Sequence, residues 1–261
     1  MEKERKDSSA RLGKTYDYIL NQIAQHGSLY FILIDPDKTN SNLKKFVRIA
    51  TECGVDGFFI GSSLLLSQNF ERCVKITKEN TDKPVIIFPG SIYQISKFAD
   101  AILFLSVLTS TNTEFIIGQQ TIASPIIFKY RIEPISTAYL LIESGKMTSA
   151  TFISQSKPIP RDKPEIAIAY ALTAQYLGMK LIYLEAGSGA DNSVPNELIK
   201  AIKSTVETPL IVGGGIKNPE NAYEKANSGA GIIVTGNILE DTPPTKIKGL
   251  ISDFVRAIHR K

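Results

Sequence analysis

The chain has 261 residues, of which 43% are hydrophobic and 21% charged, a globular composition and a length that suits one α/β barrel domain. Lys and Arg outnumber Asp and Glu by 30 to 26 but are scattered, which argues against a nucleic-acid partner and leaves a weak attraction to anionic ligands or membrane surfaces. The charged N-terminus lacks a signal-peptide core and no apolar run reaches roughly 18 residues, so we expect a cytoplasmic protein without an integral membrane segment. Two cysteines and two histidines lie in no zinc-binding spacing.

The first half of the chain alternates short apolar runs with helical patterns. Only residues 91–100 separate the third and fourth apolar runs, so we do not expect a full helix there. Residues 113–136 show no clear pattern. Buried strands are predicted at 30–34, 57–60, 85–88, 101–107 and 138–142, and helices at 40–52 and 70–79.

The second half follows the same alternation more regularly. An amphipathic helix is predicted at 164–177, with proline at its start and Gly178 just past its end. Strands are then predicted at 181–184, 210–212 and 231–234, and helices at 196–206, 219–226 and 246–258. Short apolar strands separated by helices indicate a parallel sheet, and about eight such units favour a (β/α)8 barrel over a doubly wound open sheet. No linker interrupts the pattern, so we expect one domain over 1–261, with 1–14 a flexible extension.

Two glycine-rich loops follow consecutive strands near the C-terminus. Gly213 to Gly215 come after the seventh predicted strand, and Thr235 to Asn237 after the eighth. Glycine lets backbone N–H groups approach an anion closely, and barrels of this kind often bind phosphate at these two loops. A single such loop would be a simple tight turn, but the pair predicts a phosphate site.

The stretch YLEAGSGA, residues 183–190, ends a buried strand with a carboxylate and then breaks into glycines. Glu185 would lie at the barrel mouth, where it could bind a hydroxyl and act as a general base. Tyr183 is two residues earlier on the strand, so its side chain should share a face with Glu185.

A third polar group follows the first predicted strand, at Asp35-Pro36-Asp37. Carboxylate and hydroxyl oxygens suit Mg²⁺, which usually binds through one or two carboxylates plus substrate phosphates, and Ser63 could add an oxygen from the next strand end. The alternative is a proline turn in which the aspartate caps the following helix.

The ordered set LIDPDK, FIGSS, YLEAGSGA, VGGGI and VTGN, with TAYLLIESGKMTSATFIS between the second and third, resembles the geranylgeranylglyceryl phosphate synthase family. That family includes the heptaprenylglyceryl phosphate synthases, and the resemblance runs from about residue 16 to 259. It implies a modified TIM barrel in which an irregular segment replaces one outer helix. It also implies a Mg²⁺-dependent prenyltransferase that joins the C3 hydroxyl of sn-glycerol 1-phosphate to a long isoprenyl diphosphate, geranylgeranyl diphosphate above all.

The resemblance assigns roles to particular residues. Asp35 and Ser63 would ligate Mg²⁺, although Ser62 stands where the family pattern has a glycine, which leaves open which of the two serines is the ligand. Glu185 and Tyr183 would be catalytic. Glycerol phosphate would be bound by Tyr183, Leu184, Glu185, Ala186, Gly187, Ser188, Gly189, Gly214, Gly215, Gly236 and Asn237.

The resemblance further implies a homodimer or homohexamer, and a lipid substrate would be reached by peripheral contact with a membrane. Two other functions fit parts of the pattern. Another phosphate-binding TIM-barrel isomerase or synthase would explain the glycine loops without a metal. A non-catalytic lipid or phosphate binder would give Glu185 no reason to be acidic. Turnover of a prenyl diphosphate that depends on Mg²⁺ distinguishes the three.

Overall fold

The structure, a computed structural model, describes residues 13–39, 42–240 and 242–259, and within them eight parallel strands close into a barrel in sequence order. Closure between the first and last strands confirms the (β/α)8 barrel and rules out the open doubly wound sheet. The strands are β1 (Leu29–Ile34), β2 (Gly57–Ile60), β3 (Val85–Ile87), β4 (Ala101–Val107), β5 (Glu133–Leu141), β6 (Leu181–Glu185), β7 (Leu210–Gly213) and β8 (Ile232–Thr235).

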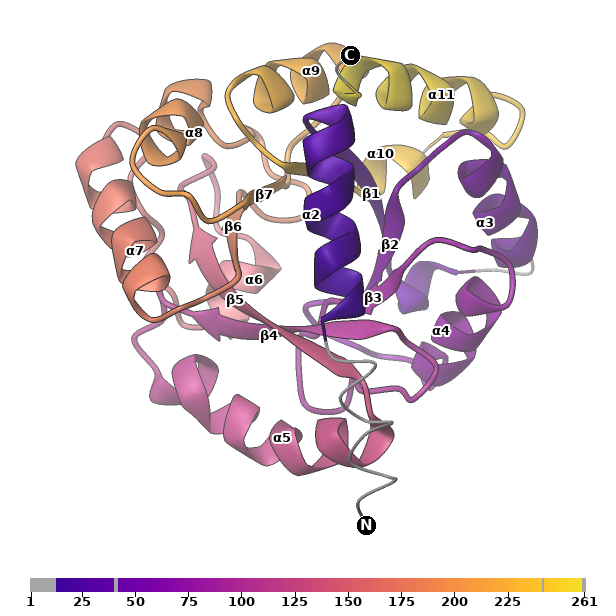
Figure 1. The fold of residues 1–261 in the computed structure, drawn as a ribbon, viewed down its shortest axis with the longest axis horizontal. Coiled ribbons are helices and arrows are strands. Elements are labelled where there is room, and N and C mark those ends of the chain that lie inside the picture. Colours follow the sequence, from indigo (N-terminus) through magenta and orange to yellow (C-terminus); the bar gives the residue numbers. More distant parts are fainter. Residues whose placement is uncertain (1–12, 40–41, 241, 260–261) are drawn as a thin grey trace.

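Helices surround this barrel as a ring (Figure 1). Its members are α3 (Leu43–Glu52), α4 (Phe70–Lys78), α5 (Gln119–Tyr130), α7 (Pro164–Tyr176), α8 (Asn196–Lys203), α9 (Pro219–Asn227) and α11 (Ile247–Ile258). The segment between β3 and β4 contains no helix, as predicted from its length. Shorter helical turns lie in the loops that follow strands: η1 (Pro36–Lys38), η2 (Glu114–Gly118), α6 (Ser149–Ile153) and α10 (Asn237–Glu240).

Helix α2 (Lys14–His26) lies across the end of the barrel where the strands begin, in front of the ring in Figure 1. Ile19 of α2 is fully buried within the barrel's inner cluster, and Tyr18 donates a hydrogen bond to the carbonyl of Asp56. This end is therefore closed, and access to the interior is left to the opposite end. Of the predicted extension 1–14, residues 1–12 lie outside the described residues, and Lys14 already belongs to α2.

The structure differs from the sequence reading in the following places. The unreadable region 113–136 is η2, a π-helical turn, followed by α5 and the start of β5, which begins at Glu133 rather than Ala138. A π-turn and the proline inside α5 break the 3.6-residue period on which sequence reading relies. Helix α7 has the expected bounds, but it is not amphipathic, because Ile166 and Tyr176 are exposed on its outer side.

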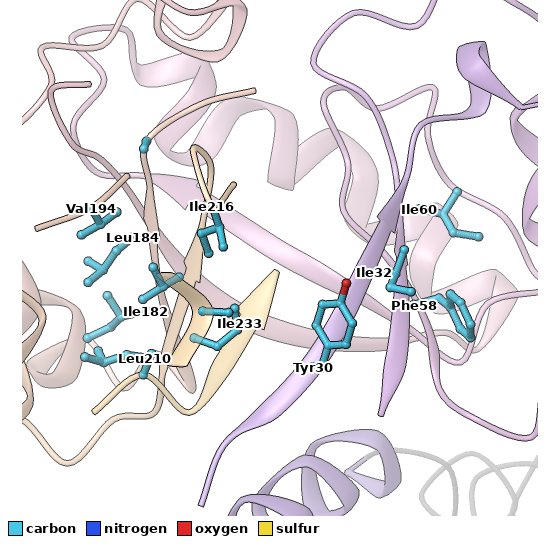
Figure 2. Close-up of a cluster of buried hydrophobic side chains, with 14 of the residues drawn as sticks. Tyr30, Ile32, Phe58, Ile60, Ile182, Leu184, Val194, Leu210, Ile216 and Ile233 are labelled. Atoms are coloured by element: carbon cyan, nitrogen blue, oxygen red, sulfur yellow. The ribbon is translucent and has the colours of Figure 1, made fainter. Parts of the chain in front are cut away.

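Two layers of apolar side chains hold the barrel together. Inward residues fill its interior, including Phe31, Phe59 and Ile86, while the alternate residues pack against the helices. Figure 2 shows part of this outer layer, from β1 and β2 at one side and β6 to β8 at the other: Tyr30, Ile32, Phe58, Ile60, Ile182, Leu184, Val194, Leu210, Ile216 and Ile233. Because strands have a period of two, this packing fixes which residues can face a ligand.

In the described part of the chain, no helix is long and apolar enough to cross a membrane.

Candidate active site

Glu185 is the last residue of β6, and its side chain points into the barrel mouth. Tyr183, two residues earlier, points the same way, as predicted, and both side chains line one cavity of about 440 Å³. Tyr139 on the adjacent strand β5 pairs directly with Tyr183 in register, and the two rings meet edge to face at 5.4 Å between centroids. The rings of Tyr139 and Tyr183 therefore form an aromatic floor of the cavity, and the carboxyl of Glu185 lies next to them.

The carboxyl of Glu185 is enclosed by hydrogen-bond donors. Its Oε1 accepts the N–H of Gly187 at 2.6 Å, and the hydroxyls of Tyr183 and Tyr139 interact with the same carboxyl. Burial raises the pKa of Glu185 from 4.5 to about 7, although these three hydrogen bonds act to lower it. A carboxyl poised near neutrality can exchange a proton at physiological pH, which is what a general base requires.

The loop after β7 leaves room for this carboxyl because it consists of glycines. Gly214 has φ of 81°, a left-handed conformation, and a Cβ there would lie 2.5 Å from Oε1 of Glu185. A Cβ at Gly213 would overlap the hydroxyl of Tyr183. The sequence therefore has glycine where any side chain would displace Glu185 or Tyr183.

The loop after β8 completes the polar end of the cavity. Gly236 and Asn237 line it together with Gly214 and Gly215, so the structure brings the two predicted phosphate loops into one wall. The Oδ1 of Asn237 accepts a hydrogen bond from Ser188 at 3.0 Å, which ties this loop to the one after β6.

Lys217 also lines the polar end, and its ammonium donates to the carbonyl of Asp191 at 2.9 Å. A glycine-lined wall with one cation beside it is suited to a phosphate group. Lys217 could not be assigned to the site from the sequence, because nothing in one chain distinguishes a surface lysine from one at a cavity wall.

Other predicted residues take different positions. Ser188 and Gly189 line the cavity, and Gly187 contacts Glu185. Leu184 and Ala186 are buried in the outer layer between strands and helices, so their side chains face away from the cavity.

Asp35 and the serines after β2 form a small oxygen cluster at the mouth. The Oδ1 of Asp35 accepts the N–H of Asp37 at 3.0 Å, the predicted capping interaction, and its Oδ2 lies 3.4 Å from the hydroxyl of Ser62. Ser62 and Ser63 both line the main cavity, whereas Asp35 lines a second pocket beside it. The donors are all oxygens, which fits Mg²⁺. Over residues 13–39, 42–240 and 242–259, no three His, Cys, Asp or Glu side chains form a ready metal cluster, so substrate phosphates would have to complete the shell.

The cavity also has an apolar end, which leaves the barrel through its wall. Strand β3 pairs with β4 only at Ile86 and Ile87, so β4 continues without that neighbour. Four consecutive β4 residues, Ile102 to Leu105, line the cavity although alternate residues face opposite sides of a sheet. The cavity must therefore pass from the inside of the barrel to the outside, where Ala123 and Ile127 of α5 flank it.

Gln120 of α5 supports this passage. Its Nε2 donates to the carbonyls of Leu105 in β4 and Phe115 in η2, and Leu105 lies beyond the β4 residues that pair with β3. Among the described residues, its Oε1 is a buried side-chain atom without a hydrogen-bond partner.

The histidines and cysteines take no part in this cavity. His26 and His259 stack at 4.7 Å between ring centroids, and His259 pairs with Asp56 at 2.7 Å, at the closed end of the barrel. Cys73 is buried in α4, and burial raises the pKa of its thiol to about 12, which makes it unreactive.

Comparison with known proteins agrees with this geometry. The PcrB family matches residues 21–254. The chain belongs to the PcrB family. Family members with sequence similarity include the geranylgeranylglyceryl phosphate synthases of Thermococcus sibiricus, 46% identical over 88% of this chain and 90% of theirs, and of Chitinophaga pinensis, 39% identical over 94% and 96%.

A solved structure provides the corresponding comparison in space. The (S)-3-O-geranylgeranylglyceryl phosphate synthase of Thermoplasma acidophilum, in complex with its substrate sn-glycerol-1-phosphate, superposes with a TM-score of 0.87. The two proteins are 34% identical, and the match covers 94% of this chain and 98% of that one. The two proteins therefore share the whole barrel fold.

Proposed function

We propose that this protein is a prenyltransferase that joins the C3 hydroxyl of sn-glycerol 1-phosphate to C1 of a long isoprenyl diphosphate, geranylgeranyl diphosphate in the first instance. The observation that carries the proposal is one continuous cavity with a glycine-lined polar end, an apolar passage, and Glu185 between them. The relatives' names and the glycerol phosphate in the Thermoplasma acidophilum complex support the same substrates.

Each region of the cavity has a task in that reaction. The loops at Gly214 and Gly236 would bind the phosphate of the acceptor, which places its C3 hydroxyl toward Glu185. The apolar passage between Phe104 and Ala123 would hold the prenyl chain away from water. The reacting carbon and oxygen would then meet above the aromatic floor.

The protonation state of Glu185 would determine whether it can accept the proton of the glycerol hydroxyl. The allylic C1 can carry positive charge, so its bond to the diphosphate can break early and the glycerol oxygen can add late. Glu185 in its ionised form, with hydrogen bonds from Gly187 and the two tyrosines, would accept the hydroxyl proton as the ether bond forms. Pyrophosphate is the other product.

Mg²⁺ is the proposed cofactor. Asp35 and a hydroxyl of Ser63 or Ser62 would hold it, and when bound it would neutralise charge on the leaving diphosphate. The contact between Ser62 and Asp35 favours Ser62, whereas the family pattern favours Ser63. Comparing Mg²⁺ affinity in Ser62→Ala and Ser63→Ala decides between them.

The proposal also covers the oligomeric state of the protein and its location in the cell. The exposed apolar residues Ile166 and Tyr176 on the outer side of α7 suit a subunit contact, which supports a homodimer or homohexamer. We propose a cytoplasmic enzyme that meets its prenyl substrate by peripheral contact with a membrane.

The test is an incubation of purified protein with radiolabelled sn-glycerol 1-phosphate, geranylgeranyl diphosphate and Mg²⁺, with parallel reactions containing EDTA or the Glu185→Gln variant. We expect an ether-linked lipid only when metal is present, and much less from the variant. No product with prenyl diphosphates of any length between C15 and C35 would exclude the transferase and leave a phosphate-binding barrel of other chemistry.

A further inference from the structure

Three large apolar side chains project into solvent from the loops that follow β2 and β3. Leu64 is 58% exposed, Leu66 81% and Tyr93 82%. We call Leu64, Leu66 and Tyr93 the apolar rim. Single exposed apolar residues are ordinary, but three on adjoining loops at one mouth need an explanation.

The rim is held rigid by polar side chains beneath it. Asp37 accepts the N–H groups of Leu66 at 2.7 Å and Ser67 at 2.9 Å. These two contacts hold the main chain at Leu66 and Ser67 in place.

A second set of contacts joins the loop after β2 to the loop after β3. The buried amide of Gln94 pairs with both main-chain groups of Ser62, at 3.1 Å to its N–H and 2.7 Å to its carbonyl. Tyr93 directly precedes Gln94 in the chain, and Leu64 lies two residues after Ser62, whose hydroxyl donates to the carbonyl of Leu64 at 3.1 Å. The exposed side chains are therefore presented by fixed backbone, which lowers the entropy lost when they are covered.

The rim borders the apolar passage directly. Ser62, Ser63 and Ile92 line the cavity, and Leu64 and Tyr93 follow them in sequence. The surrounding segments 57–70 and 84–96 contain no charged residue. A molecule that crosses this border into the passage meets no charged side chain from either loop.

We propose that the apolar rim docks the protein on an uncharged lipid surface, so that a prenyl diphosphate passes from the membrane into the cavity. This inference rests on the proposed function, because only a membrane-borne substrate needs such a port. Aliphatic side chains beside a tyrosine match the boundary between lipid headgroups and acyl chains. A rim of three side chains, roughly 500 Å² at most, falls short of the ~800 Å² per partner of a stable protein interface.

The test compares two double variants, Leu66→Ser with Tyr93→Ser at the rim, and Phe128→Ser with Tyr223→Ser as the control. The control residues are 83% and 48% exposed, and they lie on α5 and α9, away from the rim loops. Flotation with phosphatidylcholine vesicles measures docking. Initial rates are measured with geranylgeranyl diphosphate in the same vesicles and, separately, dispersed in detergent.

We expect the rim variant to bind vesicles about tenfold more weakly than the wild type, and its KM for the vesicle-borne substrate to rise by a similar factor. Its rate with detergent-dispersed substrate, its thermal unfolding and its oligomeric state should stay unchanged, and the control should match the wild type throughout. Equal vesicle binding by both variants would overturn the inference, as would a changed oligomeric state in the rim variant, which would make the rim a protein contact. If the wild type binds vesicles through the rim but turns over neither form of the substrate, the proposed function fails while docking stands.

Discussion

Replacing Glu185 by glutamine tests the state of the buried carboxyl without reference to any substrate. The side chain keeps its shape, its amide oxygen can still accept from Gly187, and the hydroxyls of Tyr139 and Tyr183 can rotate to accept from the new NH₂ group. What the variant removes is the charge. The wild type must ionise this buried group as pH rises, and the variant does not.

The expected change in the free energy of unfolding follows from the raised pKa of Glu185. A rise from 4.5 to about 7, at about 1.4 kcal/mol for each unit of pKa, corresponds to about 3 kcal/mol. Below pH 4.5 Glu185 is neutral in both the folded and the unfolded chain, so its ionisation does not change the free energy of unfolding. Between 4.5 and about 7 the unfolded chain ionises while the folded one holds its proton, so the wild type loses stability as pH rises. Above about 7 both are ionised and the loss stays constant.

Urea unfolding at pH about 5 and about 8 measures the difference. We expect Glu185→Gln to be more stable than the wild type by about 3 kcal/mol at the higher pH, equivalent to about 6 °C in Tm, and by much less at the lower pH. The Glu197→Gln variant, at an exposed acid in the first turn of α8, is the control and should show no such trend. A stability difference that is the same at both pH values would refute a raised pKa at Glu185.

Three further predictions concern the reaction. Because Glu185 must be ionised to accept a proton, kcat/KM should rise with pH through about 7, and Glu185→Gln should lower kcat by about 10²- to 10⁴-fold; a pH profile flat from about 5 to 9 would argue against its role as a base. Gly214→Ala places a Cβ 2.5 Å from Oε1 of Glu185 at positive φ, so calorimetry should show sn-glycerol 1-phosphate binding at least about tenfold more weakly, and unaltered affinity would contradict the proposed phosphate loop. Asp35→Asn should raise the Mg²⁺ concentration for half-maximal rate by about tenfold or more, with little effect on sn-glycerol 1-phosphate affinity, and an unchanged metal requirement would place the metal elsewhere.

Strand and loop positions were predictable because they are encoded locally. Apolar runs such as Gly57–Ile60 are bounded by polar or glycine residues, and the short length of 91–100 argued against a full helix there. The position of Glu185 beside Tyr183 follows from the two-residue period of a strand. The glycines at 213–215 were predicted to form a phosphate loop, and the structure adds a steric reason for two of them.

The remaining features depend on contacts between distant residues. Tyr139 reaches Glu185 only because β5 and β6 pair in one register, and no pattern within β5 reveals that neighbour. The passage through the wall exists because β3 ends at Ile87 while β4 continues, which is a comparison between strands rather than a property of either. Gln94 and Gln120 look like ordinary polar residues until their main-chain partners are known.

The central claim is that the cavity transfers a prenyl group to the C3 oxygen of glycerol phosphate. It is tested most directly by supplying sn-glycerol 1-phosphate labelled with oxygen-18 at C3, together with geranylgeranyl diphosphate and Mg²⁺, and recording mass spectra of both products. Alkyl transfer predicts that all the label lies in the ether lipid and that the released pyrophosphate is unlabelled. Label in a phosphate or diphosphate product, or no ether lipid at all, would contradict it.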